Sequence, residues 1–166
     1  MRVAVVAGPE AGHVFPAIAL CLRLAAAGDD PVLLTGTGWL DPARDAGLDA
    51  VELLGLDPEA CDDDTDAGAK LHRRAARMAV LNLPVLRGLK PDLVVSDVIT
   101  VCGGMAAELA DIPWVELSPH PLYLPSKGLP PIGSGLAPGT GMRGRMRDVT
   151  MRAFTCLLYT SPSPRD

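Results

Sequence analysis

The sequence has few aromatic residues, only six among 166, and it has no long apolar run. Lys and Arg number 15 against 20 Asp and Glu, so the formal net charge is −5. A nucleic-acid-binding face needs clustered positive charge to displace counterions from phosphates. The charge balance therefore argues against nucleic acid as a partner, and 48% hydrophobic residues predict one aliphatic core.

The chain also lacks the cysteine patterns of zinc sites and disulfide frameworks. Its four cysteines, Cys21, Cys61, Cys102 and Cys156, stand far apart with no CxxC pair. Only five apolar residues separate Arg2 from Gly8, which is too few for a signal peptide, and a membrane span needs about 20. We expect reduced thiols, no metal and a cytoplasmic location, with peripheral membrane contact left open.

Short Val-rich and Leu-rich runs alternate with longer helical patterns along the chain. The runs that read as strands are 2–7, 31–36, 50–55, 91–97 and 112–119, and the first of them has the pattern of a buried parallel strand. Such alternation predicts an α/β fold with a Rossmann-like, doubly wound parallel sheet and right-handed crossovers. The commonest order for such a sheet is 3-2-1-4-5, which we expect here.

Local signals predict where the helices begin and end. Pro16 marks the start of a largely buried first helix and Gly28 lies just past its end. Asp41 and Thr100 are expected N-caps of later helices. Another helix, 69–89, carries Leu71, Ala75, Met78 and Val85 at core spacing with a kink at Pro84.

An acidic stretch at 56–68 invites a calcium interpretation through Asp62, Asp64 and Asp66. Compared with the 12-residue calcium-binding loop of EF-hand proteins, the glycine at position 68 comes one residue too late. The twelfth position, where that loop has a Glu ligand, is Arg73. We therefore expect a solvated loop.

The most informative stretch is "GPEAGHVFPAIALCLRLAAAG", which follows the first strand. In the order 3-2-1-4-5 the first and fourth strands are neighbours, and ligands bind at their carboxyl ends. His13 follows the first strand and Asp97 ends the fourth, so the two should face each other. The carboxylate would fix the tautomer of the imidazole, whose other nitrogen can take a proton. A histidine that only caps or packs on the helix remains the structural alternative.

The same turn does not carry a dinucleotide fingerprint. Gly8 and Gly12 are four apart, Pro9 removes an N–H that could hold a pyrophosphate, and Glu10 would repel one. We expect no bound NAD.

The "GHVFP" element and the Ala/Leu-rich helix that follows resemble the N-terminal domain of inverting GT-B glycosyltransferases. The segments "KPDLVVSDVIT" and "AAELADIPWVELSP" extend the resemblance over essentially the whole of 1–154. The turn "GPEAGH" departs from the commoner Gly-rich version. An alternative within the same fold is a peptidoglycan-precursor N-acetylglucosaminyltransferase, and a further one is a non-catalytic Rossmann-like binding module.

The resemblance implies a mechanism and a set of site residues. His13 would deprotonate an acceptor hydroxyl, Asp97 would orient it, and the sugar would be transferred with inversion from a nucleotide sugar without a metal. The donor co-substrate would bind a second domain that this chain lacks, so the chain alone should be inactive. Candidate acceptor contacts, each with a structural alternative, are Gly12, Glu10, His120, Tyr123 and Leu124.

The end of the chain carries two further features. Arg143, Arg145, Arg147 and Arg152 form a basic group that suits a solvated helix face, a missing domain, or a membrane surface with a glycolipid acceptor. The final "CLLYTSPSPRD" matches the conceptual translation of a sequencing adapter. We therefore expect one acceptor-binding domain at 1–155, incomplete at its C-terminus, and a non-native tail at 156–166.

Overall fold

The computed structural model describes residues 1–62, 67–119, 129–130 and 134–160. Two compact units divide the chain, Met1–Pro119 and His120–Asp166, and each is described by itself. In the described residues no helix is long and apolar enough to cross a bilayer. The predicted boundary between a domain at 1–155 and a tail stays a prediction.

The first unit is built on five parallel strands in the order β3-β2-β1-β4-β5. Both the α/β class and the order 3-2-1-4-5 are therefore confirmed. Val5 pairs with Leu33 on one side and with Val95 on the other. The strands are β1 Arg2–Val6, β2 Asp30–Thr35, β3 Asp49–Glu52, β4 Leu93–Asp97 and β5 Trp114–Leu117.

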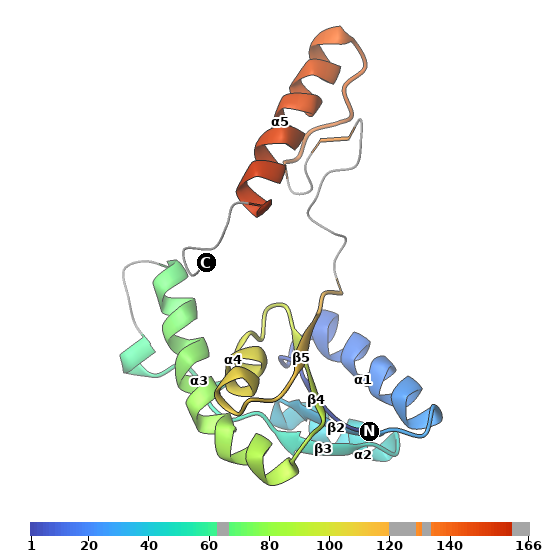
Figure 1. The fold of residues 1–166 in the computed structure, drawn as a ribbon, viewed down its shortest axis with the longest axis vertical. Coiled ribbons are helices and arrows are strands. Elements are labelled where there is room, and N and C mark those ends of the chain that lie inside the picture. The colour runs from blue at the N-terminus through green and yellow to red at the C-terminus, as the bar shows by residue number, and fades with distance from the viewer. Residues whose placement is uncertain (63–66, 120–128, 131–133, 161–166) are drawn as a thin grey trace. The chain divides into compact units, whose positions relative to one another are not determined.

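Helices cover both faces of this sheet (Figure 1). On one face lie α1 and α2, and on the other lie α3 and α4, with two short 3-10 turns, η1 and η2, in the loops. The bounds are α1 Ala11–Ala26, η1 Thr37–Trp39, α2 Leu40–Asp45, η2 Ala60–Asp62, α3 Ala67–Leu89 and α4 Cys102–Leu109.

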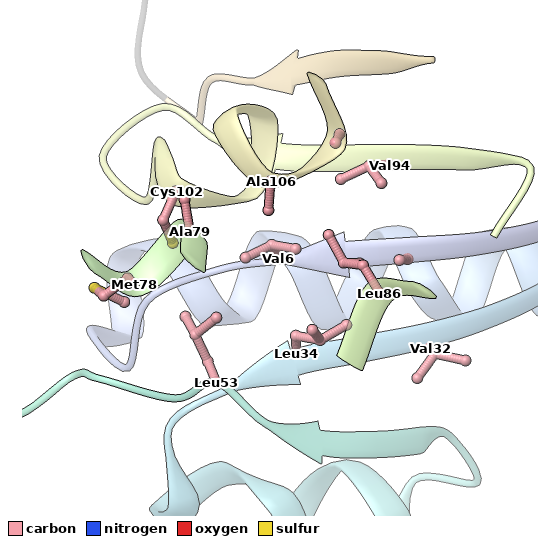
Figure 2. Close-up of a cluster of buried hydrophobic side chains, with 12 residues drawn as sticks. Val6, Val32, Leu34, Leu53, Met78, Ala79, Leu86, Val94, Cys102 and Ala106 are labelled. Carbon is pink, nitrogen blue, oxygen red and sulfur yellow. The ribbon is translucent and has the colours of Figure 1, made fainter. Parts of the chain in front are cut away.

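The core is split by the alternation of side chains along the strands. Val3 and Val5 of β1 face α1 and α2, whereas Ala4 and Val6 face α3 and α4. Figure 2 shows the cluster between the sheet and the helices α3 and α4. In it Val6 lies among Leu34 of β2, Leu86 of α3 and other apolar side chains. The strands β1, β2 and β4 are buried on both faces, which explains why they read as continuous apolar runs, whereas the edge strands β3 and β5 are partly exposed.

Helix α1 differs from the prediction at its start and in its burial. It begins at Ala11, because the main-chain carbonyl of Glu10 already accepts hydrogen bonds from the N–H groups of His13 and Val14. Pro16 therefore lies inside the helix. One face alone packs on the sheet, and Phe15 on the other face is 56% exposed, so the expected burial of the whole helix is wrong. The expected end is confirmed, since Gly28 follows with a φ of +89°.

Several other local predictions are corrected. Asp41 lies in the first turn of α2 without capping it, and α4 begins after Val101 instead of being capped by Thr100. Leu71 of α3 is 65% exposed, although Ala75 and Met78 are buried as expected.

The acidic loop is solvated only in part, because Asp62 is 2% exposed and hydrogen-bonded to Arg77 of α3. Asp64 and Asp66 lie outside the described residues.

In the second unit, α5 spans Met142–Thr160. The carboxylate of Asp148 is buried, accepts a hydrogen bond from the N–H of Gly139 at 2.8 Å and pairs with Arg147. These bonds hold its pKa below the ordinary range, the Gly139 N–H contributing most. Arg147 also donates to the carbonyl of Ala137. One of the four predicted basic side chains thus serves an internal bond, and membrane contact by the others stays a prediction.

Candidate functional site

The turn between β1 and α1 is held by the neighbouring loop. The hydroxyl of Thr35 at the end of β2 donates to the carbonyl of Gly8 at 3.4 Å, and the indole N–H of Trp39 donates to the carbonyl of Pro9 at 2.7 Å. A Cβ on Gly36 would stand 2.8 Å from the Cβ of Pro9. These close contacts fix the turn at the carboxyl ends of the central strands.

His13 occupies the first turn of α1, where Glu10 precedes the helix. Its N–H donates to the Glu10 carbonyl at 2.9 Å, and the residue as a whole is 7% exposed. Because α1 starts just after the end of β1, the imidazole lies at the switch point of the sheet, between β1 and β4, where the strand order reverses.

Asp97 ends β4 and is 1% exposed. Its Oδ1 lies 2.7 Å from Nδ1 of His13, so the prediction that the two residues meet is confirmed. The other oxygen, Oδ2, accepts from the N–H of Ile99 at 3.1 Å and from both the N–H and the hydroxyl of Thr100, at 3.3 and 3.2 Å. Both carboxylate oxygens thus face donors, which compensates the burial of a charge.

This geometry has a definite chemical capacity. A carboxylate accepts the proton on Nδ1, which places the ring in the tautomer whose Nε2 is the basic nitrogen. If Nε2 takes up a proton, the imidazolium that forms is paired at 2.7 Å with the buried negative charge of Asp97. The pair can therefore act as a general base with an orienting acid.

The loop that carries Asp97 is supported from behind. Ser96 donates its hydroxyl to the carbonyl of Thr100 at 3.0 Å. A Cβ on Gly103 would stand 2.8 Å from both the Ser96 hydroxyl oxygen and the Cβ of Val6, so α4 can approach β1 this closely only with glycine there. Packing of α4 thereby fixes the turn that holds Asp97.

A cavity of about 190 Å³ opens at the loops that follow β1 and β4, and neither His13 nor Asp97 is among the residues that line it. Its wall includes Glu10, whose main-chain carbonyl accepts the N–H of His13, and Thr100, whose hydroxyl donates to Asp97. The rest of the wall comes from the loops after β1, β3 and β4 and from the start of α3. Apolar side chains of the wall are Pro9, Leu56, Leu71, Ala75, Met78, Ile99 and Val101, and its other residues are Gly8, Arg74 and Cys102.

The predicted acceptor contacts have different outcomes. Glu10 lines the cavity, whereas Gly12 is exposed on α1 and is not part of its wall. His120, Tyr123 and Leu124 lie outside the described residues. Whether any of them touches an acceptor stays a prediction.

Two residues of the site were missed or misread from the sequence. Thr100 was expected to cap α4, but its hydroxyl holds Asp97. A threonine three residues after an acid at a strand end is a signal for such a turn. Arg74 of α3, to which the sequence analysis assigns no role, also lines the cavity.

The thiols and acids nearby do not suggest other chemistry. Burial raises the pKa of Cys102 to about 11 and that of Cys21 to about 12, so neither is a thiolate near neutrality. Among the residues that the structure describes, no three His, Cys, Asp or Glu side chains gather as metal ligands.

Fold and site together define a class: a Rossmann-like parallel sheet with a His–Asp pair at its switch point. No family model matches the chain. The chain is nevertheless a partial match, over about 71% of its length, to natural-product glycosyltransferases of the GT-B fold.

Particular relatives make this concrete. Over 130 residues the chain is 33% identical to the L-demethylnoviosyl transferase of Streptomyces niveus, covering 71% of the chain and 34% of that protein. It matches the glycosyltransferase SnogD from Streptomyces nogalater with 27% identity and a TM-score of 0.59, over 72% of the chain and 33% of SnogD. The glycosyltransferase SsfS6 of Streptomyces sp. SF2575, in complex with thymidine diphosphate, matches with 26% identity and a TM-score of 0.58, over 71% and 38%. The chain thus spans about a third of the length of the relatives it matches.

Proposed function

We propose that this chain is the acceptor-binding part of an inverting glycosyltransferase in which His13 is the general base and Asp97 orients it. The observation that carries the proposal is the 2.7 Å bond between Nδ1 of His13 and Oδ1 of Asp97, which joins two elements 84 positions apart at the switch point of the sheet. The partial match to glycosyltransferases supports it.

The reaction follows from this arrangement. Nε2 of His13 takes the proton of an acceptor hydroxyl as that oxygen attacks the anomeric carbon of a nucleotide sugar from the face opposite the leaving group. A new glycosidic C–O bond forms, the anomeric bond to the nucleoside diphosphate breaks, and its electron pair leaves on the diphosphate oxygen. The configuration is inverted, and Asp97 stabilises the imidazolium until the proton passes to solvent.

The acceptor and the donor are proposed from the relatives. We expect a small hydroxylated molecule or a glycolipid as acceptor and a hexose as the transferred sugar. The complex of SsfS6 with thymidine diphosphate supports a thymidine diphosphate sugar as donor. The donor would bind the portion of such enzymes that this chain does not match, so the 166-residue chain alone should bind acceptor and transfer nothing.

The test is a His13→Gln substitution in a longer protein that carries this sequence and a donor-binding part. We expect kcat to fall about 10²–10⁴-fold, because a positioned general base contributes about that factor. The dissociation constant of the acceptor should stay within about twofold. Turnover would be followed as release of the nucleoside diphosphate.

His72→Gln is the matched control, since His72 lies exposed on α3 and does not line the cavity. It should leave kcat unchanged. Unchanged turnover in the His13 variant would remove the base role and leave the non-catalytic binding module as the better description.

A further inference from the structure

The cavity lined by Glu10 and Thr100 contains a cation that the general-base mechanism does not use. Arg74 comes from α3 and lines the cavity among apolar side chains such as Leu56, Met78 and Ile99. The side chain is half-buried, and its Nε is shielded from solvent. Within the described part of the chain, no acceptor lies within hydrogen-bonding distance of this Nε. A buried donor without a partner is costly, which makes it a candidate contact for a ligand.

The buried carboxylate of Asp62, on the loop before α3, does not accept a hydrogen bond from Nε of Arg74. Asp62 accepts from Nε and Nη2 of Arg77 at 2.9 and 2.6 Å and from the N–H of Glu59 at 2.9 Å. Both of its oxygens are thus engaged by other donors. Arg74 adds to the positive potential at Asp62, but the described structure gives it no hydrogen bond there.

The two charged groups of the cavity wall come from different elements. The carboxylate of Glu10 belongs to the turn after β1, where it stands beside Gly8 close to the Thr100 hydroxyl. Arg74 reaches the cavity from α3, in the other layer of the fold. The cavity wall therefore carries one carboxylate and one guanidinium, and the guanidinium is the group that can pair with an anion.

We propose that Arg74 is a specificity-determining residue that pairs with an anionic oxygen on an otherwise apolar acceptor. The guanidinium offers a planar fork of donors that matches an oxyanion, and a hydrogen bond to its Nε, which is shielded from solvent, is stronger than one made in water. The cavity of about 190 Å³ is smaller than the roughly 300–1,000 Å³ of complete ligand pockets, so it takes the charged end of the acceptor. The inference rests on the proposed function for taking this cavity as part of the acceptor site.

The experiment measures binding by the 166-residue chain itself, with 2-naphthoate as the anionic probe and 2-naphthamide as its neutral counterpart. Isothermal titration calorimetry should show naphthoate binding roughly tenfold to a hundredfold more tightly, as expected for a charge-assisted bond. Raising the salt concentration should weaken naphthoate alone. Arg74→Gln should lower the affinity for naphthoate to that for naphthamide and leave naphthamide unchanged, and Arg74→Lys should recover part of the difference.

Arg23→Gln is the matched control, because it removes the same charge from an exposed position on α1. It should change neither affinity. Equal binding of the two probes, loss of both in Arg74→Gln while the variant keeps the wild-type Tm, or no binding of either probe would overturn the proposal. The salt comparison uses the unmodified chain, so naphthoate binding that does not weaken with salt overturns the proposal even if Arg74→Gln does not fold.

The assay needs neither donor nor turnover. His13→Gln should leave naphthoate affinity within about twofold. If naphthoate and naphthamide bind equally while His13→Gln still lowers kcat, only the proposed role of Arg74 is wrong. If naphthoate binds more tightly while His13→Gln leaves kcat unchanged, only the proposed role of His13 as base is wrong.

Discussion

Two carboxylates of the first unit are almost equally buried but have hydrogen-bond partners of different kinds. Asp97 is 1% exposed and Asp62 is 2% exposed. Asp97 shares its bonds between the imidazole of His13 and the main chain of its own turn. Asp62 is bound by an arginine, which stays charged at all ordinary pH values. The first arrangement suits proton transfer, and the second suits holding two segments together.

The Asp62 cluster shows what a purely structural pair looks like in this molecule. Arg77 binds both oxygens of Asp62 and also donates to the main-chain carbonyls of Gly55 and Asp57. The hydrogen bonds from Arg77 hold the pKa of Asp62 at about 2, against an ordinary value of 3.8. The loop after β3, which supplies Leu56 to the cavity, is thereby tied to α3.

The largest predicted effect concerns the orientation of the base. Asp97→Asn keeps the size of the side chain but replaces a carboxylate by an amide that cannot hold the same tautomer of His13. We expect kcat of the longer enzyme to fall about 10²–10⁴-fold. Steady-state kinetics test this, with Asp92→Asn as control because in the described part of the chain the Asp92 carboxylate accepts one hydrogen bond, from the N–H of Arg2 at 2.7 Å. If the Asp97 variant were fully active, Asp97 would have a structural role only, like Asp62.

The meeting of His13 and Asp97 could be predicted from sequence because it follows from topology. Once the strands are recognised, the order 3-2-1-4-5 brings the ends of β1 and β4 together, whatever the intervening residues are. The Asp62–Arg77 pair could not be predicted in this way. Asp62 lies in an acidic loop whose path is set by tertiary contacts with α3, and no periodic pattern in the sequence marks which of its acids turns inward.

The next effect separates the two carboxylates by pH. Because the pKa of Asp62 is lowered in the folded state, its contribution to stability is present above about pH 3.8 and is lost as the pH falls toward 2. Asp62→Asn should therefore have a lower Tm than wild type at pH 7, and the difference should shrink between pH 4 and pH 2. Thermal unfolding followed by circular dichroism measures this.

Asp41→Asn is the matched control for that experiment. Its ion pair with Arg44, at 3.2 Å, joins side chains that are 88% and 53% exposed, and such pairs contribute little. The Tm difference should be near zero at every pH. A constant difference for Asp62→Asn over the same range would show that the carboxylate charge is not what ties the loop to α3.

A smaller effect tests the packing behind Asp97. Gly103→Ala adds a methyl group 2.8 Å from the Ser96 hydroxyl and from Val6, and we expect a loss of about 1–3 kcal/mol in the free energy of unfolding. Gly88→Ala on α3 meets nothing within 4 Å and should stabilise the chain by about 0.5–1 kcal/mol. Urea denaturation compares the two. Equal values would mean that α4 does not constrain the turn that holds Asp97.

Helix boundaries were the weaker part of the sequence-based prediction, and the reason is local. Proline at a first helical position is a good rule, but here the Glu10 carbonyl starts α1 one turn before Pro16. Likewise Thr100 suits an N-cap by residue type, yet the adjacent carboxylate of Asp97 accepts its hydroxyl instead. In both places a neighbouring hydrogen-bonding group overrides the propensity.

The smallest effect uses two thiols that neighbour the two carboxylates. Cys61 is exposed beside Asp62, whereas Cys102 is 2% exposed at the start of α4, near the turn of Asp97, and burial raises its pKa to about 11. In a Cys156→Ser background, a thiol reagent at pH 8 should label Cys61 at least about a hundredfold faster than Cys102. Thr100→Val removes one hydrogen bond from Asp97 and should speed labelling of Cys102 alone, whereas Asp62→Asn should leave Cys102 unchanged. If both substitutions speed the labelling of both thiols, the two buried carboxylates belong to one cooperatively unfolding region, and the separate roles assigned to them are wrong.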